Sequence, residues 1–366
     1  MSLTVATLAA LNEAACAFYE AALASPAGEA ARRYLASRGL SGRTVARWRL
    51  GYAPGGGLAL ARHLGSAGHG ETALLEAGLM RSGTRGSYDH LRDRLVLPVI
   101  DADDRRIAGF GSRRLRDDDP SIPKYLNSPR TLLFRKSELL YGLPNLTDAA
   151  RSGEVLVVEG NIDMLALWDA GFTGAVAAAG TAFTAGHLAL IAERVPRVTL
   201  VLDGDAAGRA AADRALRLPG AGAIDMGVVT LVGANDPAEM IATGGRAAVE
   251  SALANRVPRW EALWGGVTAG HPGDDAEDRI VRKDALVELI VEGAADRAEA
   301  GRLFARAEAE LGLPVGILAA EYGDRVAGSS AGSAGQSRAP DPSTPSSRRS
   351  RFAASISAPV DFMPVL

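Results

Sequence analysis

Two periodic patterns of apolar and polar residues, one typical of strands and one of helices, alternate between residues 154 and 243. Short apolar runs of strand length, EVLVVE, AVAAAG, RVTLVLD and DMGVVTLV, are separated by segments such as NIDMLALWDAG and AGHLALIAERV, in which apolar residues recur with helical spacing. Strands that are apolar on both sides are typical of a parallel sheet whose two faces are covered. The pattern predicts an α/β domain over 151–245, with a mostly parallel sheet and helices on both faces.

The residues before this domain follow a different pattern. Up to about residue 50 the spacing is helical, and Gly39 and Pro54 are plausible stops. From Arg92 onwards the short apolar runs LVLPVID and RIAGFGSRRL flank the turn-forming DADDR, which indicates a hairpin or a small mixed sheet. We expect residues 1–150 to form a mixed α+β subdomain.

The C-terminal part divides into a helical and a low-complexity segment. Residues 246–325 contain KDALVELIVEGAADRAEAGRLFARAEAELG, whose apolar spacing predicts a small helical subdomain. Residues 326–366 are rich in Ser, Gly, Pro and Ala and offer too little apolar surface to offset the entropy lost on ordering. We expect this last segment to be disordered.

Composition narrows the classes of function. The formal net charge of the 366 residues is −3, so contact with nucleic acid requires a local basic patch. Cys16 is the only cysteine, which excludes an internal disulfide and a zinc ribbon built on CxxC pairs. The sequence contains neither a run of about 18 apolar residues nor the basic opening of a secretory signal. We expect a cytoplasmic protein that contacts no membrane and binds no zinc.

Carboxylates follow several of the predicted strands. Glu159 ends the first run, Asp203 and Asp205 follow the third in LDGDAAG, and Asp236 lies in the loop after the fourth. Because ligands of open α/β sheets bind at the carboxyl ends of the strands, we expect these side chains to share one site. Their oxygens suit Mg²⁺ and phosphoryl transfer. Taken alone, DGD would be an acidic turn in which Asp205 caps a helix, but the agreement of several strand ends favours a metal site.

Longer motifs around these carboxylates resemble a known family. VVEGNIDMLALWDAGFTGAVAAAGTAFTAGHLALIAERVPRVTLVLDGDAAG resembles the Toprim domain of DnaG-type bacterial DNA primases, with its EGYxD, ASxGTAxT and DGDxAG pattern. Upstream, YDHLRDRLVLPVIDADDRRIAGFGSRRL and PKYLNSPRTLLFRKSELLYGL resemble the N-terminal half of the primase core. The resemblance runs from about residue 34 to 243. It implies an enzyme that joins ribonucleoside triphosphates into short RNA primers on single-stranded DNA.

The resemblance also implies roles for individual residues. Glu159, Asp203 and Asp205 would be catalytic and, with Asp236, would bind Mg²⁺ or Mn²⁺. Residues that would support this site are Gly160, Asp163, Gly180, Thr181 and Gly204. Residues that would line a basic surface for template and nucleotides are Arg92, Arg94, Arg113, Lys124, Tyr125 and Asn127. For Arg92 and Arg94 a solvated strand edge is an equal alternative.

Departures from the family pattern leave other functions open. Asn161 stands where the family usually has an aromatic residue, and Ala238 where a second Asp usually follows the Asp-Pro pair. One alternative is a Toprim nuclease that uses the same carboxylates, and another is a catalytically weakened nucleic-acid-binding protein. The upstream KYLNSP and RDRLVLPV segments favour the primase over the nuclease. The presence of all three catalytic carboxylates speaks against the weakened protein.

The domains that usually flank this core in the family indicate which partners to expect. In the family a zinc ribbon precedes the core and a helicase-binding domain follows it, and this sequence resembles neither. We expect a minimal core, encoded by a phage or mobile element. Its expected partners are a replicative helicase or a separate zinc-bearing recognition protein.

Overall fold

The computed structural model of the chain describes residues 3–101, 105–116, 121–180, 182–273 and 275–326. The described residues belong to one compact unit, which spans residues 1–328. The predicted disordered segment lies outside the described residues except for Val326, as does Thr181. Within the described ranges, no helix is long and apolar enough to cross a membrane.

The N-terminal part is built on a four-stranded antiparallel sheet with the order β1-β4-β5-β6. These strands are β1 (Gly51–Ala53), β4 (Arg94–Ile100), β5 (Ile107–Arg114) and β6 (Tyr125–Asn127). A separate hairpin is formed by β2 (Met80–Gly83) and β3 (Gly86–Asp89). The helices are α1 (Val5–Ala24), α2 (Glu29–Ser37), α3 (Gly42–Arg47), α4 (Ala59–Ser66) and α5 (Glu71–Glu76). The predicted mixed α+β character of this part is therefore confirmed.

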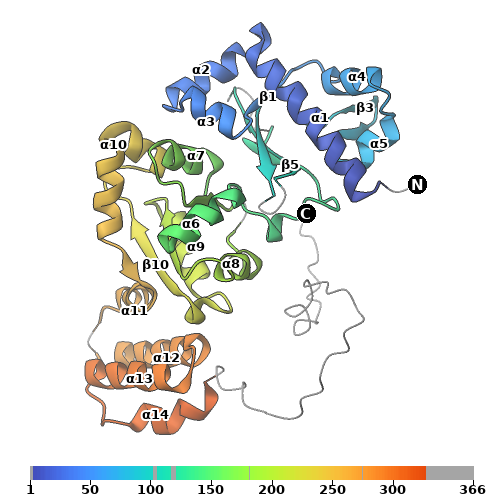
Figure 1. Ribbon diagram of the computed structural model, residues 1–366. Helices are drawn as coiled ribbons and strands as arrows, with labels where there is room; N and C mark the ends of the chain where they lie inside the picture. Colours follow the sequence, from blue (N-terminus) through green and yellow to red (C-terminus); the bar gives the residue numbers. More distant parts are fainter. Residues whose placement is uncertain (1–2, 102–104, 117–120, 181, 274, 327–366) are drawn as a thin grey trace. The chain divides into compact units, whose positions relative to one another are not determined.

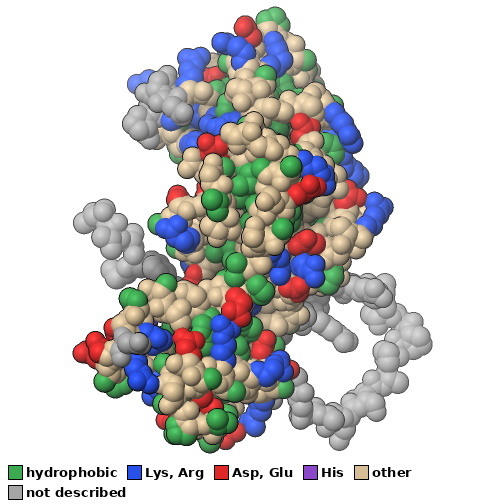
Figure 2. Space-filling model, turned by 90° about the vertical axis from the view of Figure 1, so that its left-hand side faces the viewer, with side chains coloured by type: hydrophobic (Ala, Val, Ile, Leu, Met, Phe, Trp, Pro, Cys, Tyr) green, Lys and Arg blue, Asp and Glu red, His purple; other side chains and the backbone are tan. Residues whose placement is uncertain are grey.

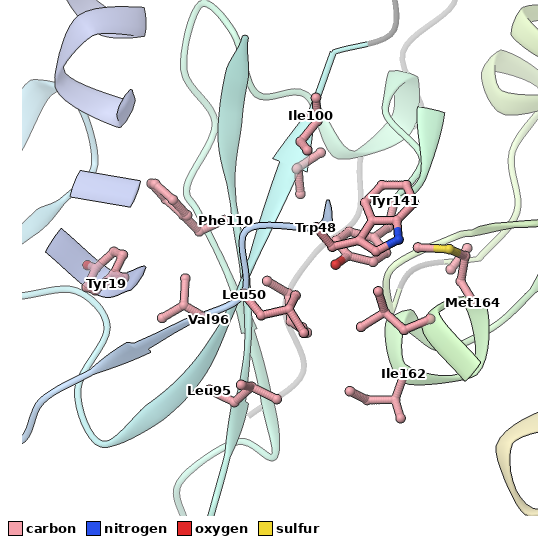
Figure 3. Close-up of a cluster of buried hydrophobic side chains, with 14 of the residues drawn as sticks. Tyr19, Trp48, Leu50, Leu95, Val96, Ile100, Phe110, Tyr141, Ile162 and Met164 are labelled. Carbon is pink, nitrogen blue, oxygen red and sulfur yellow. The ribbon is translucent and has the colours of Figure 1, made fainter. Parts of the chain in front are cut away.

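One hydrophobic core connects this antiparallel sheet to the following α/β part. On one side α1 packs on β5, where the rings of Tyr19 and Phe110 meet edge to face with centroids 5.5 Å apart. Farther along, Trp48 lies beside Tyr141 and approaches Trp168 of α7 (Asn161–Asp169), at centroid distances of 5.7 and 6.1 Å. Figure 3 shows Tyr19, Phe110, Trp48 and Tyr141 in a cluster that extends to Met164. Trp168 belongs to the same cluster. The cluster fixes the N-terminal part against α7.

The following α/β part is built on a five-stranded sheet with the order β11-β10-β9-β7-β8 (Figure 1). Its strands are β7 (Glu154–Val158), β8 (Ala175–Ala177), β9 (Arg197–Leu202), β10 (Asp225–Thr230) and β11 (Val257–Pro258). All neighbouring pairs are parallel except β10 with β11. Its helices are α6 (Leu146–Ser152), α7, α8 (Ala185–Ala192), α9 (Ala206–Leu216) and α10 (Pro237–Ala254). The predicted, mostly parallel sheet is confirmed.

The two faces of this sheet are buried in different hydrophobic clusters. On β7, Leu156 and Val158 join the cluster that contains residues of α7 and α10. Val155 and Val157 join a second cluster with residues of α8 and α9. This alternation explains why the strand is apolar at successive positions, because each side chain has its own helical layer to pack against.

The last described part, up to residue 326, is helical and has its own core around Ile290 and Phe304. Its helices are α11 (Arg259–Gly270), α12 (Ala276–Gly293), α13 (Arg297–Leu311) and α14 (Ile317–Tyr322). The boundary expected at residues 245/246 falls inside α10, which is kinked at Gly245 with φ 65°. The predicted helical content is confirmed, whereas the domain boundary stays a prediction. Short 3-10 helices lie at Pro26–Gly28, Lys136–Glu138, Leu143–Asn145, Ala221–Ala223 and Gly323–Arg325.

Candidate active site and nucleic-acid surface

The predicted acidic residues lie at one edge of the parallel sheet. Glu159 directly follows β7, Asp203 directly follows β9, and Asp236 lies in the loop that leads from β10 into α10. Since β7, β9 and β10 are consecutive neighbours in the sheet and run parallel, their carboxyl ends meet at the same edge. The expectation that separate loops contribute to one acidic site is thus supported by the strand order.

Two of the predicted ligands also cap helices. The Asp205 Oδ1 atom accepts the N–H of Gly208 at 2.8 Å, and the Asp236 Oδ1 atom accepts the N–H of Glu239 at 2.7 Å. Both bonds satisfy amide groups in the first turn of a helix. The helix-capping interpretation of Asp205 is therefore confirmed. The caps hold the loops after β9 and β10 in place. They use only the Oδ1 atom of each carboxylate and not its Oδ2 atom.

Glycines allow close approaches around these loops. A Cβ atom on Gly208 would collide with the main-chain oxygen of Asp203, and one on Gly160 would collide with the carboxylate of Asp163. A Cβ atom on Gly204 would lie 3.0 Å from the main-chain oxygen of Leu231. The backbone contacts explain why the turn in DGDAAG requires glycine, whereas at Gly160 a Cβ atom would displace the Asp163 carboxylate.

Among the carboxyl groups of the site, Asp163 and Asp203 have the most strongly shifted pKa values. Burial, followed by the charges of Asp236 and Asp203, raises the pKa of Asp163 to about 7. Burial, followed by the charge of Glu159 and then by Asp236 and Asp205, raises the pKa of Asp203 to about 6. The carboxylates therefore repel one another across the strand ends. Such mutual repulsion is common at functional carboxylate sites.

The contacts of the site leave its negative charge largely unneutralised. Among the described residues none of these carboxylates forms a salt bridge, although the charge of Arg38 at the end of α2 lowers the pKa of Asp163 slightly against the stronger upward effects. The Oε1 atom of Glu159 is buried and has no hydrogen-bond partner. Oxygen donors with excess negative charge fit a hard divalent cation such as Mg²⁺.

The side chains do not form a closed coordination shell. In the part of the chain that the structure describes, no three His, Cys, Asp or Glu side chains converge tightly enough to hold a metal ion. The capping bonds of Asp205 and Asp236 give one reason, because each turns one carboxylate oxygen toward a main-chain amide. The assignment of Glu159, Asp203, Asp205 and Asp236 as metal ligands stays a prediction.

The predicted template-facing residues separate into exposed and buried groups. Tyr125 is exposed at the start of β6 and Lys124 is exposed directly before it, and the Lys124 ammonium lies 5.7 Å from the centre of the Tyr125 ring. Arg92 is exposed and lies over the ring of Tyr88 at 4.3 Å. Asn127 donates from Nδ2 to the main-chain oxygen of Ala179 at 3.0 Å and so connects β6 with the loop after β8.

Arg94 and Arg113 are placed differently from the prediction. Arg94 is only 4% exposed and donates to the main-chain oxygens of Pro123 and Lys124, at 2.8 and 3.3 Å. Arg113 is 6% exposed, lies 4.1 Å from the centre of the Tyr34 ring and donates to the main-chain oxygen of Arg114. A solvated strand edge is therefore wrong for Arg94. Both guanidinium groups are buried, although the Nε atom of Arg113 has no hydrogen-bond partner, so neither adds to the exposed basic surface.

Basic side chains are also dispersed elsewhere on the surface. On the face drawn in Figure 2, Lys and Arg side chains are interspersed with Asp and Glu rather than gathered into one field. This distribution agrees with the net charge of −3. Contacts with phosphates must therefore come from a few well-placed residues.

Sequence reasoning missed several residues near the site. Tyr34 lies under Arg113, and Arg38 lies over the same ring at 5.5 Å. Asn161 is 5% exposed and its Oδ1 atom has no hydrogen-bond partner. A Cβ atom on Gly111 would lie 2.9 Å from the Nδ2 atom of Asn161, so Asn161 packs directly against β5. Helical spacing could have predicted that Tyr34 and Arg38 share a face of α2, but not what that face contacts.

The family models cover both parts of this arrangement. The model of the DNA primase catalytic core N-terminal domain matches residues 18–147. The model of the Toprim domain matches residues 153–230. The DNA primase of Mycolicibacterium smegmatis is 37% identical over 291 residues, which are 77% of this chain and 46% of that relative. The chain thus spans less than half the length of that curated relative.

Solved structures match over most of the chain. The RNA polymerase domain of Mycobacterium tuberculosis primase DnaG, in complex with a double-stranded DNA oligomer with a 6-nucleotide overhang, superposes with a TM-score of 0.72 and 33% identity. The match covers 86% of this chain and 99% of that one. A DnaG primase catalytic domain bound to ssDNA gives a TM-score of 0.75 and 31% identity, over 84% of this chain and 96% of that one. The predicted resemblance and the predicted Toprim fold are both confirmed.

Proposed function

This chain belongs to the family of DnaG-type DNA primase catalytic cores, and from that membership we propose that it synthesises short RNA primers on single-stranded DNA. The observation that carries the proposal is the set of carboxylates at the ends of β7, β9 and β10, which repel one another. The DNA-bound structures of related catalytic domains support a DNA template as the substrate. The Toprim domain itself implies a divalent metal.

The proposed reaction is nucleotidyl transfer. The 3′ oxygen of the growing primer forms a bond to the α-phosphorus of a ribonucleoside triphosphate, the bond to the β-phosphate oxygen breaks, and pyrophosphate leaves. A divalent cation, Mg²⁺ or Mn²⁺, would stabilise the charge on the attacking and leaving oxygens. Glu159, Asp203, Asp205 and Asp236 would hold it. The buried, unpartnered Oε1 atom of Glu159 also has the chemistry to accept the proton of the 3′ hydroxyl.

Asp163 has a supporting part in this proposal. Its Oδ1 atom accepts the N–H of Ala238 at 3.4 Å, which joins the first turn of α7 to that of α10. With a pKa of about 7, its carboxyl group is largely protonated in slightly acidic solution. A cation held by the neighbouring carboxylates would favour the ionised form of Asp163.

The template would pass along the exposed residues of β6. Lys124 and Tyr125 offer a cation and an aromatic ring next to each other, a pairing that suits phosphate contact and base stacking on a single strand. Arg92 extends this surface from the chain segment before β4. We include Arg92, Lys124 and Tyr125 in the proposed template surface.

The decisive experiment incubates the purified chain with single-stranded DNA, labelled ribonucleoside triphosphates and Mg²⁺ or Mn²⁺, and separates the products by size. Labelled oligoribonucleotides that depend on both template and metal are expected. Asp203→Asn should abolish them, whereas Asp213→Asn, an exposed change on α9, should not. Shortened or nicked DNA without RNA would favour a Toprim nuclease, and template binding without either product would favour a weakened binding protein.

We also propose that the 366-residue chain selects start sites poorly without a partner. Phosphate contacts position a strand but do not read its bases. Its only cysteine, Cys16, is buried, so the chain has no cysteine pair for a zinc-based reader. Sequencing of primers made on a mixed template should show broad start sites that sharpen when a zinc-bearing recognition protein or a replicative helicase is added. Sharp initiation by the chain alone would contradict this proposal.

A further inference from the structure

The main-chain oxygens around β6 are held by side chains from other elements. This carbonyl row comprises the oxygens of Ile122, Pro123, Lys124, Leu126 and Asn127. The bonds run from Arg114 to Ile122 at 2.7 Å, from Arg94 to Pro123 at 2.8 Å and Lys124 at 3.3 Å, from Ser112 to Leu126 at 2.8 Å, and from His90 to Asn127 at 3.0 Å.

The position of β6 in the sheet makes these bonds important. It is a three-residue strand at the edge of its sheet and pairs only with β5. Strands this short have few ladder bonds, and an edge strand has a ladder on one side only. The side-chain hydrogen bonds to the carbonyl row therefore contribute strongly to holding the main chain around Lys124 in a fixed position.

His90 is the anchor at the Asn127 end of the carbonyl row. It directly follows β3 and is 9% exposed. The oxygen of Asn127 can only accept, so the Nε2 atom of His90 must carry the proton. The Nδ1 atom accepts a hydrogen bond from the Nε atom of Arg81 at 3.3 Å. Both ring nitrogens are thus occupied, and only the neutral Nε2–H tautomer satisfies both contacts.

The surroundings of His90 favour this neutral form. Burial lowers its pKa below the ordinary value, the bond to the Asn127 oxygen acts in the opposite direction, and the charges of Arg81, Arg94 and Arg92 lower it further. A proton on Nδ1 would also replace an acceptor with a donor facing Arg81. At neutral pH the ring can therefore serve as a fixed bridge between the β2–β3 hairpin and β6.

From Asn127 the connection continues into the parallel-sheet part. While His90 holds the main-chain oxygen of Asn127, the Asn127 side chain donates to the main-chain oxygen of Ala179. A continuous path of three hydrogen bonds thus leads from Arg81 through His90 and Asn127 to the loop after β8. Lys124 and Tyr125 are carried by the segment that this path and Arg94 immobilise.

We propose that His90 is a positioning residue for template binding, which acts by fixing the β6 segment that presents Lys124. The inference rests on the proposed function, because it assigns His90 to the template surface of that same site. A long, flexible lysine binds a phosphate more tightly when its backbone is held beforehand, since less conformational freedom is lost on binding. His90 contributes no charge of its own to the template.

A double-mutant cycle tests this role. The affinity of the full chain for a fluorescent single-stranded oligonucleotide is measured by anisotropy at pH 7.5 for the wild type, His90→Leu, Lys124→Ala and the double variant. His90→Leu should weaken binding about fivefold, in line with the loss of a buried hydrogen bond. In the Lys124→Ala background the same change should have almost no effect, because the residue through which His90 acts is gone. Fivefold losses that multiply would overturn the inference.

His90→Gln is the matched control. A glutamine can donate to the Asn127 oxygen and accept from Arg81, so it should restore most of the affinity that His90→Leu loses. Unfolding midpoints of all variants separate misplacement from loss of fold. If His90→Leu does not fold cooperatively, the cycle is repeated with Arg81→Leu, an exposed position, and the same non-additivity with Lys124→Ala is expected.

The outcomes distinguish this inference from the function on which it rests. Absence of oligonucleotide binding by the wild type would remove the proposed function, and the role of His90 with it. Normal binding by the wild type that His90→Leu leaves unchanged would overturn only the role of His90. Failure of His90→Gln to recover any affinity in a folded protein would also overturn it.

Discussion

The Nδ2 atom of Asn127 donates a hydrogen bond of 3.0 Å to the main-chain oxygen of Ala179. The two residues are 52 positions apart in sequence: Asn127 ends β6, and Ala179 lies in the loop after β8 of the other sheet. Ala179 has a positive φ of 57°, and the following Gly180 has a φ of 73°. The bond therefore ends on a turn in the left-handed region, which a non-glycine residue adopts only with support. Asn127 thus connects β6, which carries the proposed template surface, to that turn.

Replacing Asn127 by Ala should destabilise the protein and weaken template binding. Loss of this bond should lower the free energy of unfolding by about 1 kcal/mol. Binding should fall as well, because β6 loses its tether to the loop after β8. Urea unfolding and oligonucleotide anisotropy measure the two effects. Asn255→Ala is the control, since Asn255 is exposed and bonds only within its own helix turn. Equal behaviour of the two variants would contradict this role.

Asp163→Asn should change how stability depends on pH. The pKa of Asp163 is about 7 in the folded protein and 3.8 as the ordinary value, so the folded state keeps a proton that the unfolded state has lost between these values. The contribution of Asp163 to stability therefore falls as pH rises from about 4 to about 7, and its loss is complete above that range.

The Asn variant lacks this titration and should be more stable than the wild type at pH 8, by at most about 4 kcal/mol. The difference should shrink toward pH 4. Denaturant unfolding at several pH values, in a buffer with a metal chelator, tests this expectation. Asn255→Ala, an exposed change without a titratable group, is the control and should leave the pH dependence of stability unchanged. A constant difference between Asp163→Asn and the wild type at all pH values would refute the prediction.

Arg38→Ala should raise the pKa of Asp163 further. Burial and the neighbouring carboxylates push this pKa upward, and Arg38 is a cation that counteracts them. Without it, the pH range over which stability is lost should extend to higher values. The same unfolding series measures the shift. Arg33→Ala on the exposed side of α2, where Arg33 pairs with Glu29, is the control and should leave the range unchanged. A shift of equal size in both variants would contradict a specific effect of Arg38.

Lys124→Ala should weaken template binding more than folding. Lys124 is exposed and its ammonium lies 5.7 Å from the centre of the exposed Tyr125 ring, so its removal should cost little folding free energy. Loss of one phosphate contact should make the plot of log affinity against log salt shallower by about 1. Lys283→Ala on α12 is the control. Unchanged affinity and slope would place Lys124 outside the template path.

The parallel sheet and the position of the acidic residues could be predicted because they depend on local patterns. Each residue of β7 from Val155 to Val158 is buried on one face or the other, which produces the uninterrupted apolar run, and Glu159 directly follows it. The cap by Asp205 was equally local, since the acceptor and the Gly208 amide are three residues apart. Turn chemistry of this kind is visible in a short stretch of sequence.

The burial of Arg94 could not be predicted in the same way. Its partners, Pro123 and Lys124, are 29 and 30 positions away and come into contact only when β4, β5 and β6 pair. The same holds for His90 and Asn127, which are 37 positions apart. Charge and spacing identify an arginine on a strand but not whether its hydrogen bonds go to solvent, to phosphate or to a distant backbone.

Because β7 is buried on both faces, only positions at its two ends can carry charged side chains. Charged side chains are confined to the two ends of this strand, Glu154 and Glu159, because every position between them belongs to a hydrophobic cluster. Insertion of one residue into β7 would exchange the two clusters and carry Glu159 away from Asp203 at the end of β9. The acidic site can therefore be altered by exchanging side chains at strand ends, whereas its spacing along the chain is locked by the packing of the sheet on both sides.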